Sequence, residues 1–214
     1  MSEMKFGVGQ SIPRVEDPRF AMVLAEELSK LAFAYSSCVG IHADCVAPYL
    51  VDLGTEEQKR RWLPPFCTGE LVTAIAMTEP GGGSDLAALR TSAVRSGADW
   101  VLNGSKTFIT NGPYADTIVF ICKLDEGNDP SERKILSFVL DRGMPGLEQS
   151  KPLRKMGMHS SPTGELFLDD VRVGIDRLVG ETEDVASGGR EGAKATFMQE
   201  RSGVAAMALG MIEE

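Results

Sequence analysis

The stretch AMTEPGGGSD, residues 76–85, organises the chain, because it ends the first strand that follows the helical part of the sequence. The apolar residues 71–77 lead into it and are typical of a buried strand. The consecutive glycines permit positive φ and let a ligand approach main-chain N–H groups, which suits a phosphate or pyrophosphate. Ser84 and Asp85 can hold the turn or contact such a ligand. Taken alone, the loop is better explained as an ordinary glycine-rich turn. It is not a dinucleotide-binding fingerprint, because no helical pattern follows the glycines directly.

Apolar residues before this stretch recur at helical spacing. Asp17 and Pro18 are typical of an N-cap and a first helical turn, and the periodic pattern continues to Ala32. Residues 36–40 interrupt it, and a second helix is predicted over 41–53.

A short third helix is predicted to begin at Thr55. The segment Glu56-Glu57-Gln58 supplies the acidic first turn that follows an N-cap residue. The pattern continues through Trp62, and Pro64-Pro65 is predicted to stop the helix.

After Gly69 the period changes from that of helices to that of strands. The segment Asn103-Gly104 is the strongest hairpin signal in the chain. Strands are predicted over 71–78, 91–95, 100–102, 107–109, 117–122, 135–140, 165–168 and 170–173. Turns at this spacing are typical of an all-β sandwich or barrel.

The helical period returns from Gly188 and still carries an apolar face at Glu214. Such a face must be buried, so we expect partner helices outside this polypeptide. The prediction is an α+β protein with a helical segment over 1–70, a central β domain over 71–183, and the first helix of a C-terminal helical bundle over 184–214.

Composition excludes several classes of function. A net charge of -9 argues against nucleic acid as a partner. No apolar run is long enough to span a membrane, and the first ten residues lack the features of a signal peptide. The four cysteines show no C-x-x-C spacing, so no metal site is expected, and reduced thiols favour a cytoplasmic location.

A second motif, NGSKTFITNG at residues 103–112, lies a short way downstream. In this order and spacing the two motifs resemble those of the acyl-CoA dehydrogenase family, (A/C)-x-T-E-P-x-x-G-S-D and N-G-x-K-x-x-I-T-N-G, which line the flavin in the central domain. Shorter segments are also similar to that family, at residues 54–59, 155–158, 166–171 and 199–201. The last of these, Gln-Glu-Arg, resembles its long-chain and isovaleryl branches.

The resemblance implies an FAD site in the β domain. The cofactor-binding residues that it implies are Met77, Thr78, Gly83, Ser84, Phe108, Ile109 and Thr110. Phe108 would be an aromatic wall against the isoalloxazine, where many relatives have Trp. The alternatives are that Phe108 is an ordinary core aromatic and that Thr78 and Thr110 are ordinary strand residues.

The resemblance also implies where chemistry occurs. Glu200 would be the catalytic base, and Ser84 and Arg201 would contact the acyl-CoA substrate. Independently of the resemblance, Arg133 lies on a charged loop and could bind the CoA phosphates through charge-assisted bonds. The alternatives are that Glu200 and Arg201 form a solvated helix face and that Arg133 lies on a plain exposed loop. Met198 replaces an acidic residue that is common in relatives, so different substrate contacts are expected there.

The implied activity is FAD-dependent α,β-dehydrogenation of an acyl-CoA thioester to the trans-2-enoyl-CoA, with electrons passed to an electron-transfer flavoprotein. The resemblance further implies a homo-oligomer, a dimer or a tetramer, in the full-length form. Two alternatives stay open. The chain is a non-catalytic fragment that binds flavin, CoA or a partner, or it is an acyl-CoA oxidase that passes electrons to oxygen.

Overall fold

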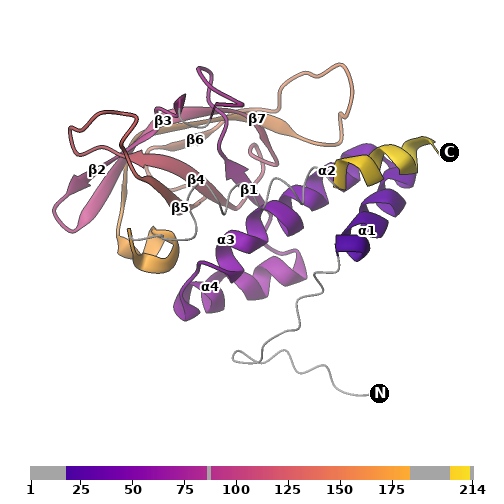
Figure 1. The fold of residues 1–214 in the computed structure, drawn as a ribbon, viewed down its shortest axis with the longest axis horizontal. Helices are drawn as coiled ribbons and strands as arrows, with labels where there is room; N and C mark the ends of the chain where they lie inside the picture. Colours follow the sequence, from indigo (N-terminus) through magenta and orange to yellow (C-terminus); the bar gives the residue numbers. More distant parts are fainter. Residues whose placement is uncertain (1–17, 86–87, 184–202, 213–214) are drawn as a thin grey trace.

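The computed structural model describes residues 18–85, 88–183 and 203–212. A group of helices lies against one side of a curled β-sheet (Figure 1), which confirms the predicted α+β class. The helices before the sheet are α1 (Pro18–Leu31), α2 (Phe33–Gly40), the π-helix η1 (Ile41–Val46), α3 (Ala47–Val51) and α4 (Glu56–Thr68). The division into domains at residues 70 and 183 stays a prediction.

The first helical break lies at Ala32 and not over 36–40, where the sequence pattern predicted it. Ala32 is extended, with φ -169° and ψ 128°, and α2 follows immediately. Ser36, which looked like part of an interruption, is buried within α2 and its Oγ donates to the carbonyl of Ala25 at 3.1 Å. A polar residue therefore fits this helix because it bonds to the neighbouring helix α1.

Helix α4 begins with the predicted capping box but does not end at its prolines. The Thr55 hydroxyl accepts from the Gln58 amide, and the Gln58 side chain bonds back to the amide of Thr55. Pro64 and Pro65 lie inside the helix, which ends at Gly69 with φ 76°. The buried positions Gln58, Trp62 and Phe66 are four residues apart, so packing of this face outweighs the main-chain bonds that the prolines cannot donate.

The sheet combines parallel and antiparallel pairs. Its strands are β1 (Thr73–Ala76), β2 (Ser92–Ser96), β3 (Asp99–Thr110), β4 (Thr117–Leu124), β5 (Ile135–Asp141), β6 (Leu147–Gln149) and β7 (Thr163–Val173). Strand β4 is at the centre: β1 and β2 pair in parallel along one edge, and β5 pairs antiparallel along the other. From β2 the sheet continues through β3 and β7 to β6.

The predicted hairpin at Asn103-Gly104 is wrong, because β3 runs through it without turning. Gly104 has φ 149° and lies at a shift in the register between β3 and β7, so it marks a bulge. A Cβ on Gly104 would approach Thr91 Oγ1 to 2.6 Å, and this contact requires glycine. The turn lies earlier, around Gly97, and joins β2 to β3.

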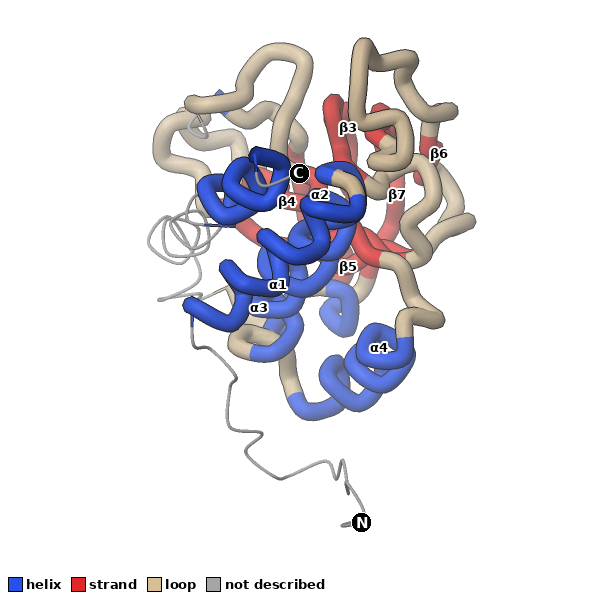
Figure 2. Tube along the Cα trace, turned by 90° about the vertical axis from the view of Figure 1, so that its right-hand side faces the viewer, coloured by secondary structure: helices blue, strands red, loops and turns tan. Residues whose placement is uncertain are grey.

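Two apolar clusters stabilise the arrangement. One fills the inside of the curled sheet and includes Trp100, Phe120 and Phe138. The other lies between the outer face of β4 and the helices, where Trp62 and Phe66 are buried. Every residue of β4 is buried because the strand contributes to both clusters, and Figure 2 shows the helices stacked in front of the strands.

The described part of the C-terminal segment, residues 203–212, is helical and packs against α1. A Cβ on Gly210 would lie 2.2 Å from the carbonyl oxygen of Glu26, so the two helices approach closely there. Two short 3₁₀ turns, η3 (Ile175–Arg177) and η4 (Val179–Glu181), follow β7. Across residues 18–85, 88–183 and 203–212, no helix is both long and apolar enough to cross a bilayer.

Candidate cofactor site

The two sequence motifs lie side by side in the structure. The chain leaves β1 at Ala76 and passes next to β3, where the Thr107 amide donates to the Thr78 carbonyl at 2.9 Å. The glycine-rich loop then turns back on itself, since the amides and carbonyls of Glu79 and Gly82 bond to each other at 2.9 and 3.1 Å. A Cβ built on Gly83 would lie 3.8 Å from Thr78 Cγ2, so the loop stays next to Thr78.

Phe108 lies at a second irregularity of β3. The pairing with β7 shifts register between Lys106 and Ile109, and Phe108 between them has a left-handed backbone with φ 58°. Such a conformation is uncommon for a bulky residue and points to a functional constraint. Ile109 is buried in the core, whereas Phe108 is 67% exposed. Phe108 is therefore not a core aromatic, and its ring is presented at the surface of the motif pair.

A buried ion pair joins the two motifs. Lys106 Nζ lies 2.8 Å from Glu79 Oε1, and the side chains are 0% and 5% exposed. The same ammonium donates to the carbonyls of Met77 at 3.1 Å and Ile121 at 2.7 Å. Burial by itself would raise the pKa of Glu79, but hydrogen bonds from Lys106 and Thr91 and the charge of Lys106 outweigh it, and the pKa is lowered. Glu79 is therefore a carboxylate at neutral pH.

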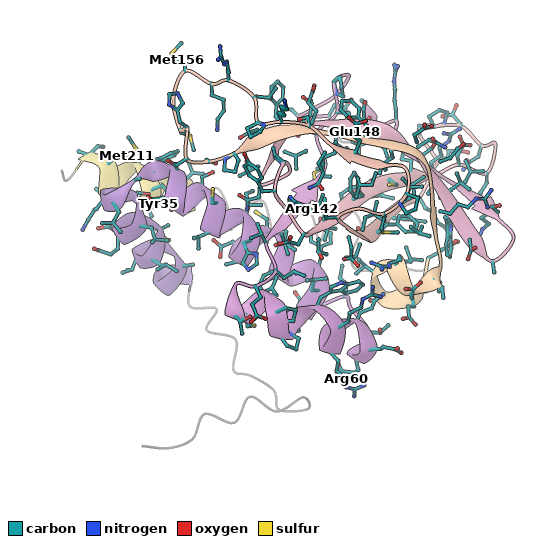
Figure 3. The ribbon with its side chains drawn as sticks, turned by 180° about the vertical axis from the view of Figure 1, so that it is seen from behind. Tyr35, Arg60, Arg142, Glu148, Met156 and Met211 are labelled. Atoms are coloured by element: carbon teal, nitrogen blue, oxygen red, sulfur yellow. The ribbon has the colours of Figure 1, made fainter. Side chains whose placement is uncertain are left out.

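Asn111 anchors the other end of the irregular segment 107–110. Its Nδ2 donates to the carbonyls of Cys38 and Thr73, each at 3.2 Å, and its amide donates to Pro162 at 2.8 Å. These bonds join β3 to α2, to β1 and to the loop before β7. Figure 3 shows Met156 at the outer tip of that loop.

The arrangement fits a flat ligand with polar edges. No hydrogen bond joins the hydroxyls of Thr78, Ser84 or Thr110 to another residue of the described ranges, so these groups can serve a ligand. Phe108 adds an exposed aromatic surface, and the glycine loop adds main-chain N–H groups. An isoalloxazine needs a flat apolar contact and donors at its edge, and its pyrophosphate needs N–H groups, so the residues present fit FAD.

The other predicted site residues lie apart from this group or outside the description. Arg133 is on the loop between β4 and β5, where it pairs with Asp125 at 2.7 Å and donates to the Asn128 carbonyl at 3.3 Å. Its contact with CoA stays a prediction. Glu200 and Arg201 lie outside the described residues.

Glu79, Lys106 and Asn111 belong to the two motifs, but the sequence alone predicted no role for them. A signal was present for Lys106, because a charged residue stands among apolar and β-branched neighbours in a strand. The counter-charge of Lys106 could not be identified from the sequence, because only the fold brings Glu79 next to it.

Known proteins are similar to this chain in sequence and in fold. A family model of the acyl-CoA dehydrogenase N-terminal domain matches residues 15–70, and one of the middle domain matches residues 74–171. Long-chain specific acyl-CoA dehydrogenase of Rattus norvegicus is 45% identical over 152 residues, which are 69% of this chain and 35% of that protein.

Solved structures agree. Butyryl-CoA dehydrogenase from Megasphaera elsdenii has a TM-score of 0.84 at 33% identity, covering 96% of this chain and 52% of that one. A glutaryl-CoA dehydrogenase from Mycobacterium smegmatis in complex with FADH2 has a TM-score of 0.77 at 31% identity, covering 87% and 45%. The chain thus spans about a third to a half of the length of these proteins. With both family models matched in sequence order, the chain belongs to the acyl-CoA dehydrogenase family.

Proposed function

We propose that this chain supplies the flavin-facing part of an acyl-CoA dehydrogenase, which converts an acyl-CoA thioester to the trans-2-enoyl-CoA with FAD as cofactor. One observation carries the proposal: Thr78 and the glycine loop lie next to the strand segment that presents Phe108 and Thr110. The likeness to a structure described with FADH2 supports the choice of cofactor.

The residues of the site have distinct roles in this proposal. The hydroxyls of Thr78 and Thr110 bind the polar edge of the isoalloxazine, and Phe108 supplies the apolar wall that keeps the ring flat. Met77 and Ile109 contribute main chain around it, while Gly83 and Ser84 bind the pyrophosphate and the adjoining pantetheine. When bound at these residues, FAD would supply the redox chemistry of the dehydrogenation.

Glu200 is the proposed base for the α proton of the thioester, and Arg201 the proposed substrate contact beside it. A carboxyl that works as a base near neutral pH must face an apolar pocket, which raises its pKa. Glu200 stands three residues before the helical segment 203–212, whose sequence has an apolar face, and this position is compatible with that demand.

The partners follow from the family resemblance. We propose an electron-transfer flavoprotein as the electron acceptor and a homo-oligomer as the assembled enzyme. The cytoplasmic location stays a prediction, as does the contact between Arg133 and CoA.

The test is the absorbance of purified protein with FAD under anaerobic conditions. Flavin bands should survive removal of free FAD and should bleach when a saturated acyl-CoA is added. Glu200→Gln should keep the bands and lose the bleaching. A protein that binds FAD but never bleaches, whatever the acyl chain, is the non-catalytic module. Bleaching followed by release of hydrogen peroxide in air identifies an oxidase.

A further inference from the structure

Lys106 and Glu79 connect the two motifs at a point where neither exposes its charge to water. Lys106 belongs to β3 and Glu79 to the glycine-rich loop, and their side chains are 0% and 5% exposed. Each hydrogen of the ammonium has an acceptor, on Glu79, Met77 and Ile121. One carboxylate oxygen of Glu79 accepts from the Thr91 amide at 2.9 Å, and the other accepts from the Arg90 amide at 2.7 Å.

A pair of this kind contributes little to stability that apolar residues could not provide. Moving each charge from water into a buried site costs several kcal/mol. Replacing a buried ion pair with apolar residues is therefore often neutral or stabilising. An apolar pair, however, cannot form directional hydrogen bonds. Three donors aimed at three acceptors fix the relative positions of the segments that carry them.

Those segments are the ones that the cofactor would contact. Lys106 directly precedes the bulge that turns Phe108 outward, and the carbonyl it contacts on Met77 directly precedes Thr78. The third acceptor, Ile121, lies in the fully buried strand β4. The ammonium therefore ties both motif segments to the most buried strand of the sheet.

We propose that Lys106 and Glu79 are positioning residues for the flavin: they hold Thr78 and the Phe108 bulge at a fixed separation without touching the cofactor. The inference rests on the proposed function for its ligand. The tether itself has a direct marker that needs no ligand, because the Thr107 amide bonds to the Thr78 carbonyl across the same gap.

The experiment compares the 214-residue chain with a double variant, Lys106→Met with Glu79→Gln. The double variant contains no unpaired buried charge. The glutamine oxygen keeps an acceptor for Thr91, but the glutamine NH2 group cannot accept from the Arg90 amide. Three quantities are measured: the melting temperature, the hydrogen-exchange rate of the Thr107 amide, and FAD affinity by fluorescence titration. The control is Lys123→Met, since Lys123 is also a buried lysine that donates to a carbonyl, that of Pro130 at 2.8 Å.

We expect the double variant to stay folded with a somewhat lower melting temperature, because the Arg90 amide loses its acceptor. Thr107 should exchange at least about tenfold faster, and FAD should bind at least about tenfold more weakly. Lys123→Met should leave exchange at Thr107 and FAD affinity unchanged. Wild-type exchange and wild-type affinity in the double variant would overturn the inference. If the wild type binds no FAD, the proposed function fails, and exchange at Thr107 still decides whether the tether exists.

Lys106→Arg covers the case in which the double variant does not fold. The guanidinium keeps the charge but is larger and planar, so it cannot reproduce the three contacts of the ammonium in this closed site. A positioning role predicts faster exchange at Thr107 and weaker FAD binding in this variant. A role in charge balance alone predicts wild-type values for both and would refute the inference.

Discussion

Two groups of charged residues join separate segments of this protein, and they differ in burial. Glu79 and Lys106 join the two motifs with side chains that are almost fully enclosed. At the junction of α4 with the sheet, Asp141 Oδ2 lies 3.2 Å from Arg61 and 2.6 Å from Arg177. This group is more exposed: the side chains of Arg61, Asp141 and Arg177 are 43%, 32% and 14% exposed.

Because of this difference in burial, similar ion pairs contribute differently to stability and to geometry. In the buried pair, water cannot replace a lost partner. Removing one partner therefore costs much free energy, and the pair holds its two segments in one geometry. In the exposed group, water and salt substitute readily, so the same bonds contribute little. We therefore expect substitutions at the buried pair to have larger effects than substitutions at the more exposed group.

The largest effect is expected for Lys106→Met alone. This variant leaves the Glu79 carboxylate buried without its counter-charge, which costs about 3–5 kcal/mol of unfolding free energy. Urea unfolding followed by circular dichroism measures the loss. The matched control is Lys59→Met, because Lys59 pairs with Glu56 at 3.0 Å on the helix surface. A loss for Lys106→Met no larger than for the control would show that the pair is not buried in solution.

A smaller loss is expected for Gly104→Ala, which disturbs the same site through the backbone. The new Cβ would meet Thr91, whose hydroxyl and amide bond to Glu79, and φ at this position is 149°. We expect a loss of about 1–3 kcal/mol. Gly97→Ala is the control, since Gly97 also has positive φ but nothing lies within 4 Å of its Cβ position. Equal losses in the two variants would mean that only φ matters and that the contact with Thr91 does not.

His42 is an intermediate case, half-buried between η1 and the sheet. Its Nδ1 lies 2.8 Å from Thr73 Oγ1, its Nε2 lies 3.2 Å from the Phe66 carbonyl, and its ring stacks on Phe66. Burial lowers the pKa of His42, and the bond with Phe66 opposes that shift only in part. In the unfolded chain the histidine pKa is about 6.5. As the pH falls below that pKa, the unfolded chain binds more protons at His42 than the folded chain does, so the free energy of unfolding falls.

The corresponding variant is His42→Gln. Between about pH 7.5 and 5.5, we expect the wild-type melting temperature to fall by about 1–2 °C more than that of the variant. Other groups, including Asp44, whose pKa is raised by burial, titrate in both proteins and cancel in the comparison. An equal fall in both proteins would exclude His42 as the source.

Local pattern predicted the fold class, because helical and strand periods are signals within a few residues. The family resemblance, and not local pattern, implied that the two motifs meet at one cofactor. Thr55 with Gln58 identified the start of α4, and the glycine-rich loop identified the end of the first strand. The roles of the site residues from Met77 to Thr110 stay predictions, although the structure places their segments together.

The wrong predictions share one physical cause, which is that tertiary contacts override a local signal. Asn103-Gly104 favours a turn, but the close approach of Thr91 and the pairing with β7 keep Gly104 within a bulged strand. Pro64-Pro65 favours a helix end, but burial of Phe66 continues α4 beyond it. For the same reason, no local pattern could assign Glu79 as the counter-charge of Lys106.

Among the charged pairs, the smallest effect is expected for Asp141→Asn in the more exposed group. The amide keeps an acceptor for Thr117, which donates to Asp141 Oδ1 at 2.9 Å, but loses the charge that faces Arg61 and Arg177. A loss of about 0.5–1 kcal/mol is expected at low salt. In about 1 M NaCl the loss should shrink, because the Debye length falls to about 3 Å and screens the exposed contact with Arg61. The loss in Lys106→Met should persist at the same salt concentration, since ions cannot enter a side-chain environment that is 0% exposed. If both losses respond to salt alike, burial does not separate the two groups, and the contrast between them is not the reason for their different roles.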